Sequence, residues 1–267
     1  MEKRGIVYSF FQQPKVGGLN NSYHYDEMRY SIDTLRYRNG DVPVYVYFSP
    51  EGILDNVNHD IRTKHNVNVR YFDNTLINTH LWDEKFRVEG FWNLLYHRWQ
   101  NAIRCVLDHD LDCVLFIDSD TVFHKDVNIL FDKYNDRDVV WAKPDNSTPL
   151  LNLFNIGGAM NDGQFLLSKS AAKKLSENLE ADQSRLVNYL LNYKDENNLP
   201  NKHWTSIQFA SYMLCLEKNI PVKYFAGDEV MISSEPDTRT IENLILHHYF
   251  SGLRKKYLPE DYQLKKR

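Results

Sequence analysis

VLFIDSDTVF, residues Val114 to Phe123, has the pattern of a buried β-strand that ends in two carboxylates. Asp118 and Asp120 are two residues apart, so they share a face in an extended chain. Carboxylates on one face repel each other, and burying them is costly unless a cation lies between them. Ligands bind at the ends of buried strands in α/β proteins, and hard oxygen ligands suit Mg²⁺ or Mn²⁺. The stretch therefore predicts a divalent-metal site, the alternative being two solvated acids that bind nothing.

Composition excludes several broad classes of protein. The 267 residues are 42% hydrophobic and 25% charged, which is ordinary for a globular chain with a large core. A net charge of −4 provides no global basic field for nucleic acid. Cys105, Cys113 and Cys215 lack paired metal spacing, which predicts free thiols in a reducing compartment. Because neither a signal peptide nor a membrane-spanning run is visible, we expect a soluble, cytoplasmic protein.

Periodicity predicts that strands and helices alternate along the chain. Apolar runs favour strands at residues 5–11, 44–48, 67–72, 111–118, 138–144, 164–167, 222–227 and 243–250. Helical spacing predicts helices at residues 25–38, 91–107, 171–193 (one helix or two) and 204–219. This order is typical of an α/β protein with a largely parallel sheet. Since no linker-like composition interrupts the chain, we expect one domain, with the later segments packed onto the same sheet.

A strand that ends in D-x-D-x-V resembles two enzyme families. Asp118, Asp120 and Val122 match the motif of haloacid dehalogenase-like phosphatases, in which the first acid is a phosphoryl-accepting nucleophile and the second a general acid beside Mg²⁺. That family has the motif near the start of the chain and a later G-D-x-x-x-D motif. Here Gly227–Asp228 is followed by EVMISS, which lacks the second acid. The phosphatase is therefore the less favoured alternative.

The other resemblance, to nucleotide-sugar-dependent glycosyltransferases of the GT-A fold, covers most of the chain. Four features follow in the family's order: the strand GIVYSFF, the arginine-bearing helix YHRWQNAIRCVL before D-x-D, the N-x-G segment NDGQFLL, and the late LILHHYFSGLRKK. The glycogenin-like and lipopolysaccharide galactosyltransferase-like family is the nearest match, and it is distant. The resemblance implies a Rossmann-like domain over 1–267, with a mostly parallel mixed sheet flanked by helices. Its parts would be a nucleotide-binding half (5–123), a sugar and acceptor half (124–250) and a basic tail (251–267).

The resemblance implies a metal held by two carboxylates and one histidine. Asp120 would bind Mn²⁺ or Mg²⁺ most directly, and Asp118 would contact the metal or the donor's hydroxyls. The histidine comes from HHYF, where His247 and His248 point to opposite faces of a strand, so only one can be a ligand. His248 is preferred because His248–Tyr249 matches the start of the family pattern, and His247 is the alternate.

Donor contacts follow from the same resemblance. Arg98 matches the family's arginine on the helix before D-x-D, and Arg104 competes for this role. The basic tail would neutralise the diphosphate through Lys255, with Gly252 as the family's glycine and Arg254 or Lys256 as substitutes. Further donor contacts are expected from the first strand and from two strand ends: Tyr8, Phe10, Phe11, Gln12, Asp73 and Ser119.

Asn161 and Gly163 match the family's sugar-contacting N-x-G, since a glycine lets the backbone approach the sugar closely. Asp162 between them is expected to hold sugar hydroxyls. FNIGG offers a rival pair, Asn155 and Gly157. Asn161 is preferred because the apolar FLL follows almost directly.

One family feature is incomplete. The family has an Asp-Gln pair at the start of the helix before the next strand, whereas HWTSIQFASYML contains Gln208 without an adjacent acid. Gln208 is therefore the catalytic candidate beside Asp118 and Asp120, and retention or inversion stays open. An Asp182–Gln183 pair falls in predicted mid-helix and is interpreted as coincidental.

The expected function is transfer of a hexose or pentose from a nucleoside diphosphate sugar, with UDP-sugars favoured, to a glycan, glycolipid or glycoprotein. A third alternative is a catalytically silent sugar- or nucleotide-binding protein on the same scaffold. Neither a nucleic-acid partner nor a transmembrane segment is expected. The tail from Ser251 is predicted to close over the donor's diphosphate, the alternatives being a solvated tail or weak contact with anionic lipid.

Overall fold

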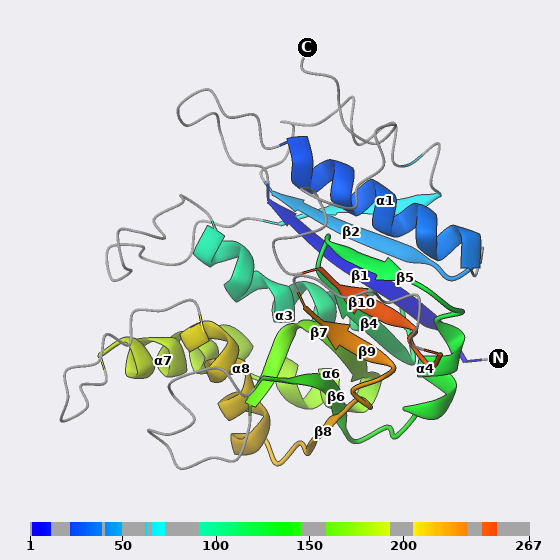
Figure 1. The fold of residues 1–267 in the computed structure, drawn as a ribbon. Helices are drawn as coiled ribbons and strands as arrows, with labels where there is room; N and C mark the ends of the chain where they lie inside the picture. Colours follow the sequence, from blue (N-terminus) through cyan, green and yellow to red (C-terminus); the bar gives the residue numbers. More distant parts are fainter. Residues whose placement is uncertain are drawn as a thin grey trace. The chain divides into compact units, whose positions relative to one another are not determined.

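The computed structural model describes residues 2–11, 22–38, 41–49, 62, 66–72, 91–145, 159–192, 205–233 and 242–249. Strands and helices alternate early in the chain, and from β4 onward they also follow one another in runs of like elements (Figure 1). The strands are β1 (Arg4–Phe11), β2 (Val44–Ser49), β3 (Val67–Tyr71), β4 (Cys113–Ile117), β5 (Thr121–Phe123), β6 (Val140–Asp145), β7 (Ala159–Ser168), β8 (Val222–Tyr224), β9 (Val230–Ile232) and β10 (Leu246–His248). The helices are α1 (Ser22–Arg38), α3 (Phe91–Asp108), α4 (Asn128–Lys133), α6 (Lys169–Ser176), α7 (Leu179–Asn192) and α8 (Thr205–Glu217).

The described strands form two sheets. A seven-stranded sheet has the order β3-β2-β1-β4-β7-β6-β8, and a three-stranded sheet has the order β5-β10-β9. β1, β2 and β3 run parallel, whereas β6 is antiparallel to β7, so the large sheet is mixed as expected. Among the late strands, β6, β7 and β8 belong to the large sheet, whereas β10 pairs with β5 and β9.

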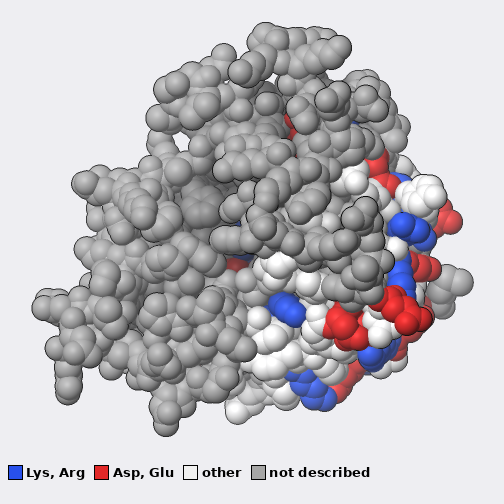
Figure 2. All heavy atoms as spheres, in the orientation of Figure 1, with Lys and Arg blue, Asp and Glu red and all other residues white. Residues whose placement is uncertain are grey.

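Both signs of charge are present on the surface. Figure 2 shows Lys, Arg, Asp and Glu side chains interspersed over the described part of one face. Such mixing agrees with the small net charge of −4. None of the described helices is long and apolar enough to span a bilayer.

The chain divides into two compact units. Unit 2 comprises Arg4–Phe72, Ile117–Asn135 and Phe225–Arg267. In this unit β2 is buried along its whole length, as expected of a parallel strand covered on both faces. α1 is joined to β1 by a 2.7 Å hydrogen bond between the hydroxyls of Tyr8 and Ser31, and to β5 by Thr34, whose Oγ1 accepts the Phe123 N–H.

Unit 1 comprises Met1–Lys3, Asp73–Phe116 and Asp136–Tyr224. Aromatic rings dominate its core where α3, β4 and β7 meet. Trp99 stacks on Phe165 with ring centroids 4.1 Å apart, and Phe116 stacks on Phe165 at 5.0 Å. The three rings fix α3 against the strands of this unit.

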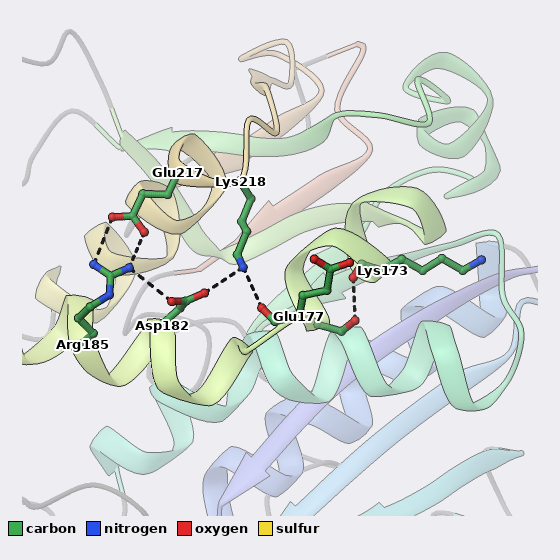
Figure 3. Close-up of polar contacts among 7 residues, drawn as sticks. Lys173, Glu177, Asp182, Arg185, Glu217 and Lys218 are labelled. Atoms are coloured by element: carbon green, nitrogen blue, oxygen red, sulfur yellow. Dashed lines mark hydrogen bonds and ion pairs between the residues drawn. The ribbon is translucent and has the colours of Figure 1, made fainter.

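Ion pairs connect α7 and α8 on the surface of unit 1 (Figure 3). Arg185 on α7 binds both carboxylate oxygens of Glu217, and Lys218 lies 2.9 Å from Asp182. Exposed pairs of this kind are each worth about 0–1 kcal/mol, so the contribution of this cluster is small.

The helical pattern predicted over 171–193 corresponds to two helices. α6 ends at Ser176, and α7 begins at Leu179, directly after Asn178, which has a positive φ of 58°. Asparagine tolerates this left-handed conformation better than most residues, and it breaks the helix here. Asp182 therefore lies in the first turn of α7, not in mid-helix as predicted.

Candidate functional site

Asp118, Asp120 and His248 form a compact cluster in unit 2. The Nε2 atom of His248 lies 2.9 Å from Oδ1 of Asp120 and 3.8 Å from Oδ2 of Asp118. One potential ligand atom from each residue lies within 4.8 Å of the others. The histidine side chain is 6% exposed, whereas the two aspartates are 19% and 18% exposed. The carboxylates are thus reachable from solvent while the imidazole is held in the protein interior.

The three-stranded sheet brings these residues together. β5 begins directly after Asp120 and runs antiparallel to β10, with Thr121 opposite His248. The Asp120 carbonyl accepts the Tyr249 N–H at 3.0 Å, and the Asp118 carbonyl accepts the Thr121 N–H at 3.2 Å. This register places His248 beside the D-x-D motif. Thr121 was not selected from the sequence, and the short TVF run after the motif was the only available signal.

His247, the alternate ligand, lies on the opposite face of β10 and is fully buried. Its Nε2 is 3.1 Å from the Ser233 hydroxyl. Burial, with smaller contributions from His124 and His248, lowers the pKa of His247 from its usual value to about 4. His247 is therefore a neutral core residue at pH 7, and His248 is the histidine beside the carboxylates.

The cluster fits a divalent cation by the chemistry of its donors. Carboxylate oxygens suit Mg²⁺ and Mn²⁺, and an imidazole nitrogen shifts the preference toward transition metals such as Mn²⁺. To act as a ligand, the Nε2 of His248 must carry no proton, which places the proton of the neutral ring on Nδ1. Asp118, Asp120 and His248 would hold such a cation and leave it able to bind oxygens of another molecule.

A second group of selected residues meets in unit 1. The Nη1 of Arg98 lies 2.9 Å from Oδ1 of Asp162, and the two side chains are 12% and 2% exposed. The Asp162 N–H donates to Oε1 of Gln208 at 3.5 Å, and Gln208 is 1% exposed. The structure therefore joins Arg98, Asp162 and Gln208 through one buried carboxylate residue.

The rival arginine occupies a different environment. Arg104 is about half exposed, and its guanidinium is 3.9 Å from the exposed carboxylate of Glu180. The Arg98 guanidinium instead lies 6.0 Å from the centre of the Phe116 ring. The two arginines differ in burial and in the carboxylate with which each pairs. The periodicity of α3 alone could not distinguish them.

The N-x-G segment lies in β7, where the Gly163 N–H donates to Oδ1 of Asn161 at 2.9 Å. Two first-strand candidates pack inside unit 2. Burial raises the pKa of the Tyr8 phenol above its usual range, and Phe10 contacts Tyr25 and Phe48 edge-on.

Other selected positions are less informative. Phe11 is the last residue of β1, and Ser119 is half-buried between the two aspartates. The remaining candidates lie outside the described residues: Gln12, Asp73, Asn155, Gly157, Gly252, Arg254, Lys255 and Lys256.

Neither a family model nor a curated protein matches the sequence. Solved structures do match. The galactosyltransferase LgtC, crystallised with donor and acceptor sugar analogs, aligns with a TM-score of 0.56 and 14% identity over 92% of this chain and 86% of that chain. Mouse xyloside xylosyltransferase 1 aligns with a TM-score of 0.58 and 10% identity over 91% and 96% of the two chains. The chain has the GT-A glycosyltransferase fold.

The GT-A fold is also that of GlyE from Streptococcus pneumoniae, which aligns with a TM-score of 0.52 and 15% identity over 92% of this chain and 55% of that chain. The resemblance to nucleotide-sugar glycosyltransferases is therefore confirmed at the level of the fold. Identities this low do not carry a reaction from one chain to another, so the donor, the acceptor and the chemistry rest on the site itself.

Proposed function

We propose that this protein is a metal-dependent glycosyltransferase whose donor is a nucleoside diphosphate sugar. The observation that carries the proposal is the convergence of Asp118, Asp120 and His248 within a GT-A fold. A divalent cation bound there would neutralise the donor's diphosphate and stabilise it as the leaving group. Asp118 and Asp120 would hold the cation from the end of β4, and His248 would offer Nε2 from β10.

The buried group in unit 1 supports a role in holding the sugar. Asp162 is fixed by the Arg98 guanidinium and by the side-chain oxygen of Gln208. A carboxylate held in this way is a rigid acceptor for sugar hydroxyls, and Asn161 and Gly163 flank it. One solved LgtC structure is an active-site mutant with glutamate in place of glutamine, so glutamine is a residue type of that active site. We infer that Gln208 acts near the anomeric carbon.

The finer parts of the proposal rest on the resemblance to nucleotide-sugar glycosyltransferases. We infer that the donor is a UDP-sugar carrying a hexose or pentose, that the cation is Mn²⁺ or Mg²⁺, and that the acceptor is a glycan, glycolipid or glycoprotein. The division into a nucleotide-binding half (5–123), a sugar and acceptor half (124–250) and a basic tail (251–267) belongs to the same proposal.

A donor panel with Mn²⁺ tests the function. We expect release of nucleoside diphosphate, by sugar transfer or slow hydrolysis, from at least one sugar nucleotide, and at least about a hundredfold less with Asp120→Asn. Asp132→Asn is the control, because this carboxylate of unit 2 is exposed and pairs with Arg4. Phosphate release from p-nitrophenyl phosphate without any sugar transfer would instead support a phosphatase.

A silent binding protein is the second candidate, since α8 has no acid in its first turn beside Gln208. It predicts calorimetric binding of a sugar nucleotide without turnover of any donor. That outcome would contradict the enzymatic proposal while leaving the metal cluster as a binding site.

A further inference from the structure

A cavity of about 400 Å³ in unit 1 is lined mainly by cations. Arg137, Lys169, Lys173 and Lys174 surround it, and Asp112 is the one acid among its described lining residues. Its volume is within the range of small-molecule sites. None of these residues belongs to the metal cluster or to the Arg98 group. We call this cavity the basic pocket.

Well-defined elements build the basic pocket. Ser168 ends β7 and caps α6, where its hydroxyl oxygen accepts the Ala171 N–H at 3.2 Å and its proton is donated to the Arg137 carbonyl. The Lys169 N–H donates to the Asp112 carbonyl at 2.8 Å. Asp112 directly precedes β4, whereas the D-x-D motif follows the other end of that strand. The pocket therefore lies at the end of β4 opposite to the one where α/β proteins bind their main ligands.

The cations of the basic pocket are only partly neutralised by protein groups. Lys169 pairs with Asp110, and Lys174 is 3.8 Å from Asp138. Among the described residues, none forms a hydrogen bond or ion pair with the guanidinium of Arg137 or the ammonium of Lys173. Figure 3 shows the Lys173 side chain extending away from the other residues drawn.

Cations of the neighbouring ion pairs differ from these two cations of the basic pocket. Arg185 and Lys218, in the same unit, each have a carboxylate partner (Figure 3). Two cations of the basic pocket therefore have no carboxylate partner in the described part of the chain and are available for an anion.

The first turn of α6 also favours binding of an anion. Acidic residues normally occupy a helix amino terminus because the backbone there carries partial positive charge. The first turn of α6 contains no acid and begins with Lys169 instead. Lys173 lies four residues after Lys169 on the same face of the helix, so two positive charges are neighbours there and repel each other. An anion in the pocket would offset both unfavourable placements.

We propose that the basic pocket binds a phosphate group, carried either by a soluble phosphorylated molecule or by a lipid headgroup. A phosphate offers several acceptor oxygens and up to two negative charges. The planar guanidinium of Arg137 can bind two of these oxygens, and Lys173 and Lys174 can act as point charges. The ligand would bind without a metal, which separates this site from the metal cluster.

The test uses the full-length protein in EDTA, so that metal-dependent binding is absent. Inorganic phosphate is titrated while the backbone amide signals of residues 168–174 are followed by NMR. Phosphatidic acid in phosphatidylcholine vesicles is tested separately by co-sedimentation. The pocket variant is Arg137→Gln with Lys173→Gln, both exposed positions. The control, Arg185→Gln with Lys223→Gln, removes the same charge from cations paired elsewhere in unit 1.

We expect phosphate to shift the amide signals at the start of α6, or the acidic vesicles to bind the protein. Affinity should fall about tenfold for each cation removed in the pocket variant and stay within about twofold in the control. If the protein binds the vesicles but inorganic phosphate gives no NMR shift, the bound phosphate belongs to a lipid headgroup. If phosphate gives NMR shifts but the vesicles do not bind, it belongs to a soluble molecule. Absence of both, or equal loss in the pocket variant and the control, overturns the proposal.

Discussion

His248 lies 2.9 Å from Asp120 because Thr121 and His248 face each other across the β5–β10 ladder. The distance is therefore a consequence of strand register rather than of sequence proximity. Two carboxylates that follow β4 and one imidazole from β10, which are far apart in the chain, are thereby gathered at one point. Binding of a cation there and the pairing of β5 with β10 should consequently depend on each other.

Asp120→Asn should weaken Mn²⁺ binding by about a hundredfold or more, because the amide removes a charged ligand while keeping the shape of the side chain. Even changes outside the ligand set commonly cost 10–100-fold in metal affinity. Electron paramagnetic resonance of free Mn²⁺ measures the change directly. Asp132→Asn should leave the affinity unaltered, and an equal loss in both variants would indicate a general charge effect.

The two adjacent histidines should respond oppositely to substitution. His248→Ala should lower Mn²⁺ affinity by about tenfold or more, since it removes the third ligand. His247→Phe should leave the affinity nearly unchanged, because His247 contacts Ser233 on the other face of β10. Calorimetric titration of both variants with Mn²⁺ gives the comparison. Loss of binding only in His247→Phe would reverse the assignment.

The buried pair of Arg98 and Asp162 should show strong coupling in stability. Arg98→Met leaves the Asp162 carboxylate buried without its cation, which should lower the free energy of unfolding by about 3–5 kcal/mol. Asp162→Leu should have a similar effect, whereas the double variant should lose much less than the sum. Urea denaturation of all four proteins measures the cycle. Additive losses would mean that the pair acts as two separate contacts.

Alkaline pH should destabilise the protein through Cys215. Burial raises the pKa of this thiol to about 12, above its value in an unfolded chain. Between about pH 9 and 12 the native state keeps the proton that the unfolded state releases, so stability falls as pH rises, by at most about 1.4 kcal/mol per pH unit. Denaturation of the wild type and Cys215→Ala across this range should show a shallower decline for the variant. Parallel curves would show that Cys215 is not responsible.

The sequence predicted the long elements and the strand-end carboxylates because burial patterns extend over many residues there. β4 is apolar throughout, and the periodicity of α3 spans several turns, so both were recognisable. β5 and β9 have only three residues each, too few for a period to appear. Asn178 broke a helix through a single backbone angle, which composition does not reveal.

The partners of distant side chains could be predicted only through the family resemblance, which favoured Arg98 and His248. Arg98 and Arg104 have the same chemistry, and only tertiary packing assigns one to a buried carboxylate and the other to the surface. The distinction between His247 and His248 depended on the register of β10, which is set by its partner strands.

The shortness of β10 and its doubled histidine have a consequence for how this site can change. Side chains alternate along a strand, so a slip of one residue exchanges the faces of neighbouring positions. In most metal sites such a slip would remove the ligand altogether. Here it would bring the imidazole of His247 opposite Thr121 in place of His248, so the strand would still present a nitrogen donor to the aspartates. The histidine doublet would thus make the site tolerant of a single-residue insertion in the connection between β9 and β10, whereas a deletion would place Tyr249 opposite Thr121.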